Sequence, residues 1–210
     1  MTDTGQACCD VHAVESGQRR ALNIALVVNA TMFLIEFGAG LLGHSTALLA
    51  DSLDMLGDAL VYGFSLYVVG RGPRWLARGA LLKGSVMAVF AAGVAGEAVF
   101  KLLHGALPDA RVMGLLGLLA LAANTSCLLL LRRHRRDDIN MRSAWVCSRN
   151  DVLANLGVLV AAAGVAITGA GWPDIAVGTL IAFLIAASAW RVMRQALRQL
   201  RTPLAQVSGG

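Results

Sequence analysis

Hydrophobic residues fill six stretches of this chain, and polar residues gather in the short breaks between them. A helix needs about 20 mainly apolar residues to cross the hydrocarbon core of a bilayer, and each stretch has about that length. Gly-Pro, Leu-Pro and Gly-Trp-Pro sequences mark three of the breaks as turns. The pattern therefore predicts an all-α integral membrane protein with six transmembrane helices, at Ala21–Leu42, Ser45–Val69, Ala80–Leu103, Val112–Leu131, Ser143–Thr168 and Pro173–Arg191.

The composition supports a membrane protein over a soluble one. Hydrophobic residues make up 57% of the 210 positions and charged residues only 15%, whereas about a quarter of a soluble domain is charged. The mean hydropathy is +0.65. A net charge of +5 is compatible with nucleic-acid binding, but the arginines lie in the breaks between apolar stretches. That distribution is typical of membrane topology, and we expect no nucleic-acid partner.

Basic residues also predict the orientation. They cluster before the first stretch, after the second and fourth, and after the sixth, and cytoplasmic loops of membrane proteins carry such an excess of arginine and lysine. We therefore expect both termini in the cytoplasm and the protein in the cytoplasmic (inner) membrane. The expected parts are a disordered cytosolic tail at 1–18, a six-helix transmembrane domain at 19–200 and a short cytosolic tail at 201–210.

Acidic residues within the apolar stretches are the candidates for function, because a carboxylate in the hydrocarbon region costs about 2.5–3.5 kcal/mol on insertion scales. The second stretch contains Asp51, Asp54 and Asp58, whose spacings of three and four place them on one helix face. The fifth stretch contains Cys147 and Asp151, also four apart. If these antiparallel helices are neighbours, we expect Asp58 near the level of Cys147, and Asp54 near the level of Asp151.

A metal site explains these acids better than helix packing does. Three anions share one face of the second stretch, which has no basic residue, so ion pairing within that helix cannot neutralise them. Asp54, Asp58, Cys147 and Asp151 offer four ligands, which suits tetrahedral Zn²⁺. Thiolate disfavours Mg²⁺ and Ca²⁺, which prefer oxygen. Cys147 by itself is equally compatible with a small packing residue.

Other polar residues receive separate predictions. Glu36, Asp51 and Asn155 are candidate proton or path residues, although a structural role is as good an explanation for Asp51. Glu97 and Lys101 are four apart and are expected to pair and support helix packing. We expect Cys127 to pack among apolar residues. Arg149, taken as the one available cation, is expected to face away from the site, toward Glu36 or the headgroups. Cys8, Cys9 and His12 are expected to capture a thiophilic ion in the cytosol.

These motifs resemble the cation diffusion facilitator family over about residues 18 to 200. The second stretch, from Ser45 to Asp58, is similar to the family's second helix, whose two metal ligands correspond to Asp54 and Asp58. The family's fifth helix has a His-x-x-x-Asp pair, which corresponds to Cys147 and Asp151. The Asn29 and Glu36 spacing and the Gly-Trp-Pro-Asp174 sequence also resemble the family.

The resemblance implies a homodimer that exports Zn²⁺ or related ions from the cytoplasm in exchange for protons, with no bound cofactor. The chain departs from the family in three ways. Sulfur replaces a nitrogen ligand at Cys147, which favours softer ions such as Cd²⁺. The basic segment Arg132–Arg142 contains one histidine, His134, where many relatives have a histidine-rich stretch. The cytosolic metal-binding domain that usually follows the sixth helix is expected to be missing.

The expected mechanism is alternating access around the four ligands. Carboxylates crowded together in a low-dielectric environment favour their protonated form, so a bound dication would displace protons. Two other functions remain open: a proton-coupled exporter of small organic cations, and a membrane metal sensor that transports nothing. Aromatic residues, which such organic-cation sites usually need, are only 6% of the chain. The sequence has no nucleophile–base arrangement or phosphate loop, so we do not expect an enzyme.

Overall fold

The computed structural model describes residues 16–67, 73–133 and 139–201, and its regular secondary structure in these ranges is α-helical. Five of the six helices, all but α2, are long and apolar enough to cross a membrane. In α2, every 18-residue stretch includes three aspartates. The predicted fold class, an all-α multi-pass membrane protein, is confirmed. The helices are α1 (Ser16–Leu42), α2 (Thr46–Tyr67), α3 (Pro73–His104), α4 (Ala110–Arg132), α5 (Ile139–Thr168) and α6 (Trp172–Arg201).

Several helices extend beyond the apolar stretches that predicted them. Helix α3 begins at Pro73, α5 begins at Ile139 and α6 continues to Arg201, so parts of the predicted breaks are helical. The predicted tail at 1–18 is also too long, because α1 begins at Ser16. Hydrophobicity marks only the part of a helix that lies in hydrocarbon, and it says nothing of turns that continue among the headgroups.

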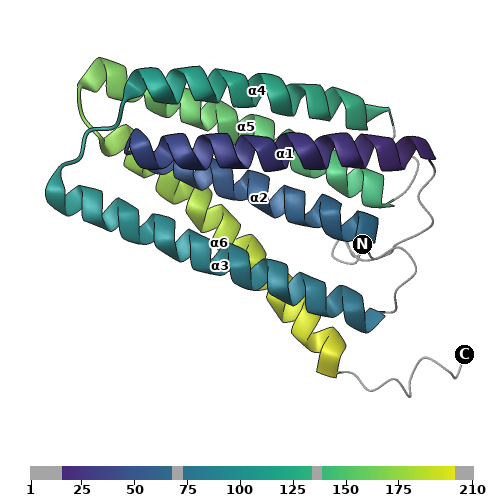
Figure 1. Cartoon of the computed structure of the whole chain (residues 1–210). Coiled ribbons are helices and arrows are strands. Elements are labelled where there is room, and N and C mark those ends of the chain that lie inside the picture. The colour runs from purple at the N-terminus through teal and green to yellow at the C-terminus, as the bar shows by residue number, and fades with distance from the viewer. Residues whose placement is uncertain (1–15, 68–72, 134–138, 202–210) are drawn as a thin grey trace, which may run out of the picture.

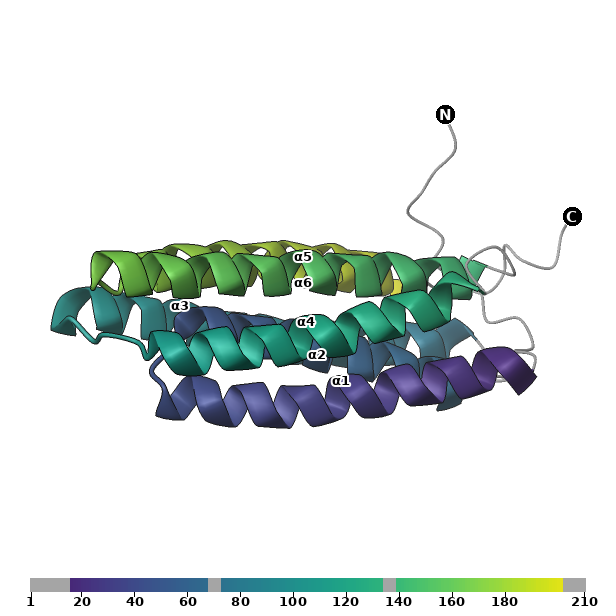
Figure 2. The ribbon, with the colours of Figure 1, turned by 90° about the horizontal axis from the view of Figure 1, so that it is seen from above.

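The helices run in alternating directions along a common axis (Figures 1 and 2). The most extensive helix contacts join α3 to α6, α1 to α2 and α4 to α5. Helix α1 begins and α6 ends at the same end of the bundle (Figure 1), and the turns at 43–45, 105–109 and 169–171 lie at the opposite end. Large apolar side chains remain on the outside, for example Leu42 at 86% and Ile167 at 84% exposure, as expected of a surface in contact with lipid.

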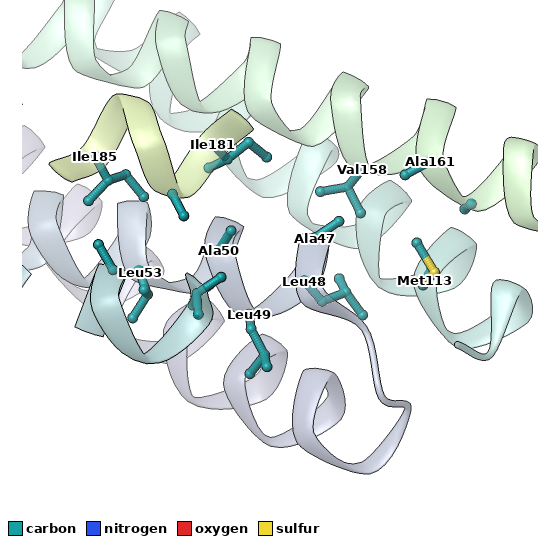
Figure 3. Close-up of a cluster of buried hydrophobic side chains, with 14 of the residues drawn as sticks. Ala47, Leu48, Leu49, Ala50, Leu53, Met113, Val158, Ala161, Ile181 and Ile185 are labelled. Atoms are coloured by element: carbon teal, nitrogen blue, oxygen red, sulfur yellow. The ribbon is translucent and has the colours of Figure 1, made fainter. Parts of the chain in front are cut away.

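The main hydrophobic core surrounds the first half of α2 (Figure 3). Ala47, Leu48, Ala50 and Leu53 of α2 are completely buried. They belong to one cluster with residues of α3, α4, α5 and α6, including Met87, Met113, Val158, Ala161, Ile181 and Ile185. This packing holds α2 in the middle of the bundle, with α5 and α6 on one side of it.

Asp174 of α6 caps the N-terminus of α2. Its carboxylate accepts hydrogen bonds from the backbone N–H of Thr46 at 2.7 Å and of Ala47 at 3.0 Å, and from the hydroxyl of Ser45 at 2.6 Å. The Ser45 hydroxyl in turn accepts from the N–H of Leu48 at 3.1 Å. The first four N–H groups of a helix have no partner within it. Here all four are satisfied, because the N–H of Leu49 donates to the Ser45 carbonyl at 3.2 Å.

Lys101 of α3 completes this arrangement, which we call the Asp174 clasp (Asp174, Ser45, Thr46, Ala47 and Lys101). Its ammonium donates to the His44 carbonyl at 2.8 Å and to the Thr46 hydroxyl at 2.9 Å. It lies 3.9 Å from Asp174 and 3.6 Å from Glu97. The predicted Glu97–Lys101 pair is therefore confirmed, but it is part of a larger network that joins three helices.

Helix α6 approaches α2 very closely beside the clasp. A methyl group at Gly178 would lie 2.5 Å from the Thr46 carbonyl carbon and 2.7 Å from the Ala47 nitrogen. Both neighbours are backbone atoms, which cannot turn aside as a side chain can. Glycine is therefore required at this position for the two helices to pack as they do.

Candidate metal site

The four predicted ligands lie on the wall of one cavity of about 570 Å³ between α2, α3, α5 and α6. Asp54 and Asp58 come from α2, and Cys147 and Asp151 come from α5. The two helices are antiparallel and in contact, and the i, i+4 pair of α2 therefore faces the i, i+4 pair of α5 across the cavity. Asp58 and Asp151 are buried, with 6% and 2% exposure.

Asp58 is at the centre of the contacts among these residues. Cys147 lies within hydrogen-bonding reach of its carboxylate, which agrees with the predicted level of the pair. The Tyr62 hydroxyl, itself buried, donates to Asp58 Oδ2 at 2.9 Å. Asp151 interacts electrostatically with Asp58 most strongly and with Asp54 second, so Asp58 faces both residues of α5.

The cavity is not a preformed coordination shell. Among the residues that the structure describes, no three His, Cys, Asp or Glu side chains are gathered closely enough to hold a metal ion. Asp151 Oδ2 is nevertheless buried and accepts no hydrogen bond from the residues that the structure describes. A buried carboxylate oxygen without a donor is costly, and either a proton or a cation would remove that cost.

Asp51 faces away from the cavity toward a second polar group. Its Oδ2 accepts a hydrogen bond from the Asn155 side-chain amide at 2.6 Å, and the Asn155 carbonyl oxygen accepts from Asn124 at 3.0 Å. Glu36 of α1 lies within hydrogen-bonding reach of Asp51. All four side chains are buried. We call Glu36, Asp51, Asn124 and Asn155 the buried polar chain.

The contact between Glu36 and Asp51 has a chemical requirement. Two carboxylates only accept hydrogen bonds, so the pair can bond only when one of them holds a proton. Both Glu36 oxygens are without a donor among the described residues, as is Asp51 Oδ1. Since Asn155 already donates to the other oxygen of Asp51, Glu36 is the better position for the proton. The buried polar chain is thus suited to hold a proton behind the cavity.

Lys83 of α3 is a cavity residue that sequence reasoning missed. It lines the same cavity as the four predicted ligands, and it interacts electrostatically with Asp54, Asp58 and Cys147. The prediction that Arg149 is the one available cation is therefore wrong. The sequence did contain a signal for this residue. Lys83 lies five residues inside the spanning segment that begins at Arg78, and a charged residue in such a segment usually has a functional role.

Two of the three remaining predictions can be compared with the structure. Arg149 is exposed and does not line the cavity, as expected, and its guanidinium lies over the Trp145 ring, 5.8 Å from the centroid. Cys127 packs in an apolar cluster with 2% exposure, which confirms its packing role. The predicted capture residues Cys8, Cys9 and His12 lie outside the described residues.

Comparison with known protein families finds one model that matches, the cation efflux transmembrane domain, over residues 22–201. This range covers α2 to α6 completely and α1 from residue 22 onward. It includes every residue of the cavity and of the buried polar chain.

Curated relatives resemble the chain over most of its length. It is 25% identical over 201 residues to the metal cation efflux system protein CzcD of Cupriavidus metallidurans, and 27% identical over 202 residues to the zinc transporter ZitB of Escherichia coli. It is 23% identical over 198 residues to a cadmium, cobalt and zinc/H(+)-K(+) antiporter of Bacillus velezensis. These alignments cover 87–90% of the chain but only 63–64% of the relatives, so the chain spans less than two thirds of their length.

Proposed function

This chain belongs to the cation efflux family, a family of transporters rather than enzymes, and we propose that it exports divalent transition-metal cations, Zn²⁺ first among them, from the cytoplasm in exchange for protons. The relatives named for zinc, and for cadmium, cobalt and zinc together with H⁺, support this substrate class. The proposed ligands are Asp54, Asp58, Cys147 and Asp151.

The observation that carries the proposal is the unsatisfied carboxylate in the cavity. Asp151 Oδ2 is buried without a hydrogen-bond donor, and the nearest charges on α2 are the further acids Asp58 and Asp54. A dication between the two helices would supply the missing charge to all three. The ligands would have to move together when the ion enters, because no three of the described His, Cys, Asp or Glu side chains are gathered closely enough to hold it. Alternating access requires such a site to exist in more than one arrangement.

Protons would take the place of the metal when it leaves. Carboxylates that face one another in a low-dielectric cavity repel, and protonation relieves the repulsion. Metal entry then releases protons, and the proton gradient resets the site. The buried polar chain extends this function, because the Glu36–Asp51 contact needs a proton and Asn155 links that contact to α5. Glu36, Asp51 and Asn155 are proposed as proton or path residues on that basis.

Cys147 is proposed to tune the preferred ion. A site with three carboxylates and one thiolate suits tetrahedral Zn²⁺ and also accepts softer ions such as Cd²⁺. The thiol is half-buried in the cavity and lies beside Asp58, which is the position that a ligand on α5 needs.

The proposed setting is the cytoplasmic membrane, with the N-terminus and the C-terminus both in the cytoplasm. Arg19 and Arg20 before the α1 span and Arg191, Arg194 and Arg198 in the last turns of α6 lie at the same end of the bundle (Figure 1). Positive charge of this kind favours the cytoplasmic side. A homodimer is proposed from the family resemblance.

Metal uptake into inverted vesicles containing the purified protein, with an imposed proton gradient, tests the proposal. The native chain should take up Zn²⁺, and Asp54→Ala and Asp151→Ala should abolish uptake. Asp109→Ala removes an exposed carboxylate that caps α4 and should leave uptake unchanged. Normal Zn²⁺ transport by both site variants would show that the ligands are wrongly assigned. Binding without flux would favour a sensor, and proton flux driven by organic cations alone would favour the organic-cation exporter.

The role of Cys147 is tested by the same assay with a panel of Zn²⁺, Cd²⁺, Co²⁺, Ni²⁺ and Mn²⁺. Cys147→His should shift the preference from Cd²⁺ toward Zn²⁺, because imidazole is a less soft ligand than thiolate. An unchanged order of preference would show that the thiol does not bind the ion.

A further inference from the structure

Lys83 places a positive charge in a cavity that is otherwise lined by the four proposed cation ligands. Its side chain is half-buried and lines the cavity. Its Cε lies 4.0 Å from the position that a Cβ at Gly57 would take, directly beside Asp58 in the chain. In the part of the chain that the structure describes, its ammonium is not within 4.0 Å of a carboxylate oxygen.

The charged and titratable groups around Lys83 come from three other helices that line the cavity. Helix α2 contributes Asp54 and Asp58, and α5 contributes Asp151 and the Cys147 thiol. Helix α6 contributes a second cation, Arg191, which is exposed at the edge of the cavity. Lys83 is therefore the cation that lies deeper among the acids, and it offsets part of the negative charge of Asp54 and Asp58.

We propose that Lys83 is an internal competitor of the transported ion: its ammonium offsets part of the negative charge of Asp54 and Asp58 while the cavity is free of metal, and an entering dication displaces it. This inference rests on the proposed function, because it assumes that the cavity binds the metal. It assigns a role to a residue outside the ligand set and makes that residue a determinant of specificity.

The Lys83 ammonium can move from the aspartates toward the headgroup region while its backbone stays in place. Lys83 lies five residues after Arg78, where the spanning segment begins, which corresponds to about 7–8 Å along the helix. A lysine near the end of a spanning helix can extend its stem toward the headgroups. Gly57 on the facing helix has no side chain in the way of this movement. Two positions are thus available, one over the acids and one toward water.

Competition of this kind has consequences for which ions bind. A monovalent ion that replaced the ammonium would gain no net charge and would lose its own hydration. A dication with ligands of the right kind gains an additional unit of attraction and direct bonds to carboxylate and thiolate. The ammonium also opposes the dication while both are near the cavity, which weakens binding and favours release. We therefore expect Lys83 to lower affinity for the substrate.

Equilibrium Zn²⁺ binding to the purified full chain, measured by titration calorimetry at fixed pH and low salt, tests the inference. Lys83→Gln should tighten Zn²⁺ binding about tenfold, because it removes one opposing charge from a partly buried site. Lys83→Arg keeps the charge and should bind as the native chain does. Arg149→Gln is the matched control, since it removes a cation that faces away from the cavity, and it should have no effect.

The outcomes separate this inference from the proposed function. Unchanged or weaker Zn²⁺ binding in Lys83→Gln would overturn the role of Lys83, provided that Asp54→Ala and Asp151→Ala abolish binding. Native Zn²⁺ binding in those two aspartate variants would instead overturn the ligand assignment, and with it the inference. A gain in affinity cannot result from misfolding, so tighter binding by Lys83→Gln alone would support the competitor role.

Discussion

Replacing Asp174 by alanine should destabilise the protein more than any other single loss of a helix cap. The change removes the acceptor of three hydrogen bonds, at 2.6, 2.7 and 3.0 Å. It leaves the N–H groups of Thr46 and Ala47 without a partner in the core. It also removes the closest completely buried countercharge of Lys101, which lies 3.9 Å away.

The size of the effect follows from the burial of these groups. A hydrogen bond to a charged group contributes about 1.5–3 kcal/mol, but three such values cannot be added, because the variant no longer has to bury the carboxylate. Breaking a buried ion pair by removing one partner costs about 3–5 kcal/mol. We therefore expect a loss of about 3–5 kcal/mol, or a fall of about 6–20 °C in the unfolding midpoint of a chain of this size.

Thermal unfolding of the purified protein, followed by circular dichroism in one detergent, measures this effect. Asp109→Ala is the matched control, because Asp109 also caps a helix through two backbone N–H groups, at 2.9 and 3.2 Å, but is exposed. It should lose only about 1 kcal/mol. Equal shifts in Asp174→Ala and Asp109→Ala would refute the argument that burial decides the cost.

A double variant tests the electrostatic part separately. Asp174→Ala leaves the Lys101 ammonium without its buried countercharge, and adding Lys101→Met removes that ammonium. The two losses should then be less than additive, since both residues belong to one network. Strictly additive losses would show that Lys101 does not depend on Asp174.

Two further predictions concern packing and the site. Gly178→Ala should cost about 1–3 kcal/mol of stability by overpacking, because its methyl group would meet backbone atoms of Thr46 and Ala47. Gly114→Ala is the control, since its methyl group would have no atom within 4 Å, and it should leave the unfolding midpoint unchanged or slightly raised. Equal effects of the two changes would contradict the close approach of α6 to α2. Tyr62→Phe removes the hydroxyl that donates to Asp58 and should weaken Zn²⁺ binding about tenfold. Because this hydrogen bond is buried, the change should also cost about 1.5–3 kcal/mol of stability. Native affinity would show that the hydrogen bond does not position a ligand.

The aspartates of α2 show how far local spacing can go. Spacings of three and four predicted one acidic face, and Asp54 and Asp58 do share a cavity with Cys147 and Asp151. Asp51 belongs to the same predicted face but contacts Asn155 and lies near Glu36 instead. Helical periodicity places residues on a face about one third of the circumference wide. It does not say which neighbouring helix each residue on that face contacts.

The partners of the charged residues could not be found from spacing. Glu97 and Lys101 are one turn apart, so their pairing was predictable. The contacts of Lys101 with Asp174 and with the start of α2 join residues that are 55 or more positions apart. Lys83 likewise reaches the acids only because α3 lies beside α2.

The sequence alone determined that this is a six-helix membrane protein with two acidic i, i+4 pairs, because hydrocarbon thickness and the helical repeat act on consecutive residues. Only the tertiary structure decided that Lys83 shares the cavity, that Asp174 caps α2 and that Asp51 turns toward Glu36. Those contacts depend on how each helix is rotated and which neighbour it packs against. Rotation and neighbour choice are set by the summed packing of many side chains, as at Gly178, and no short segment contains that information.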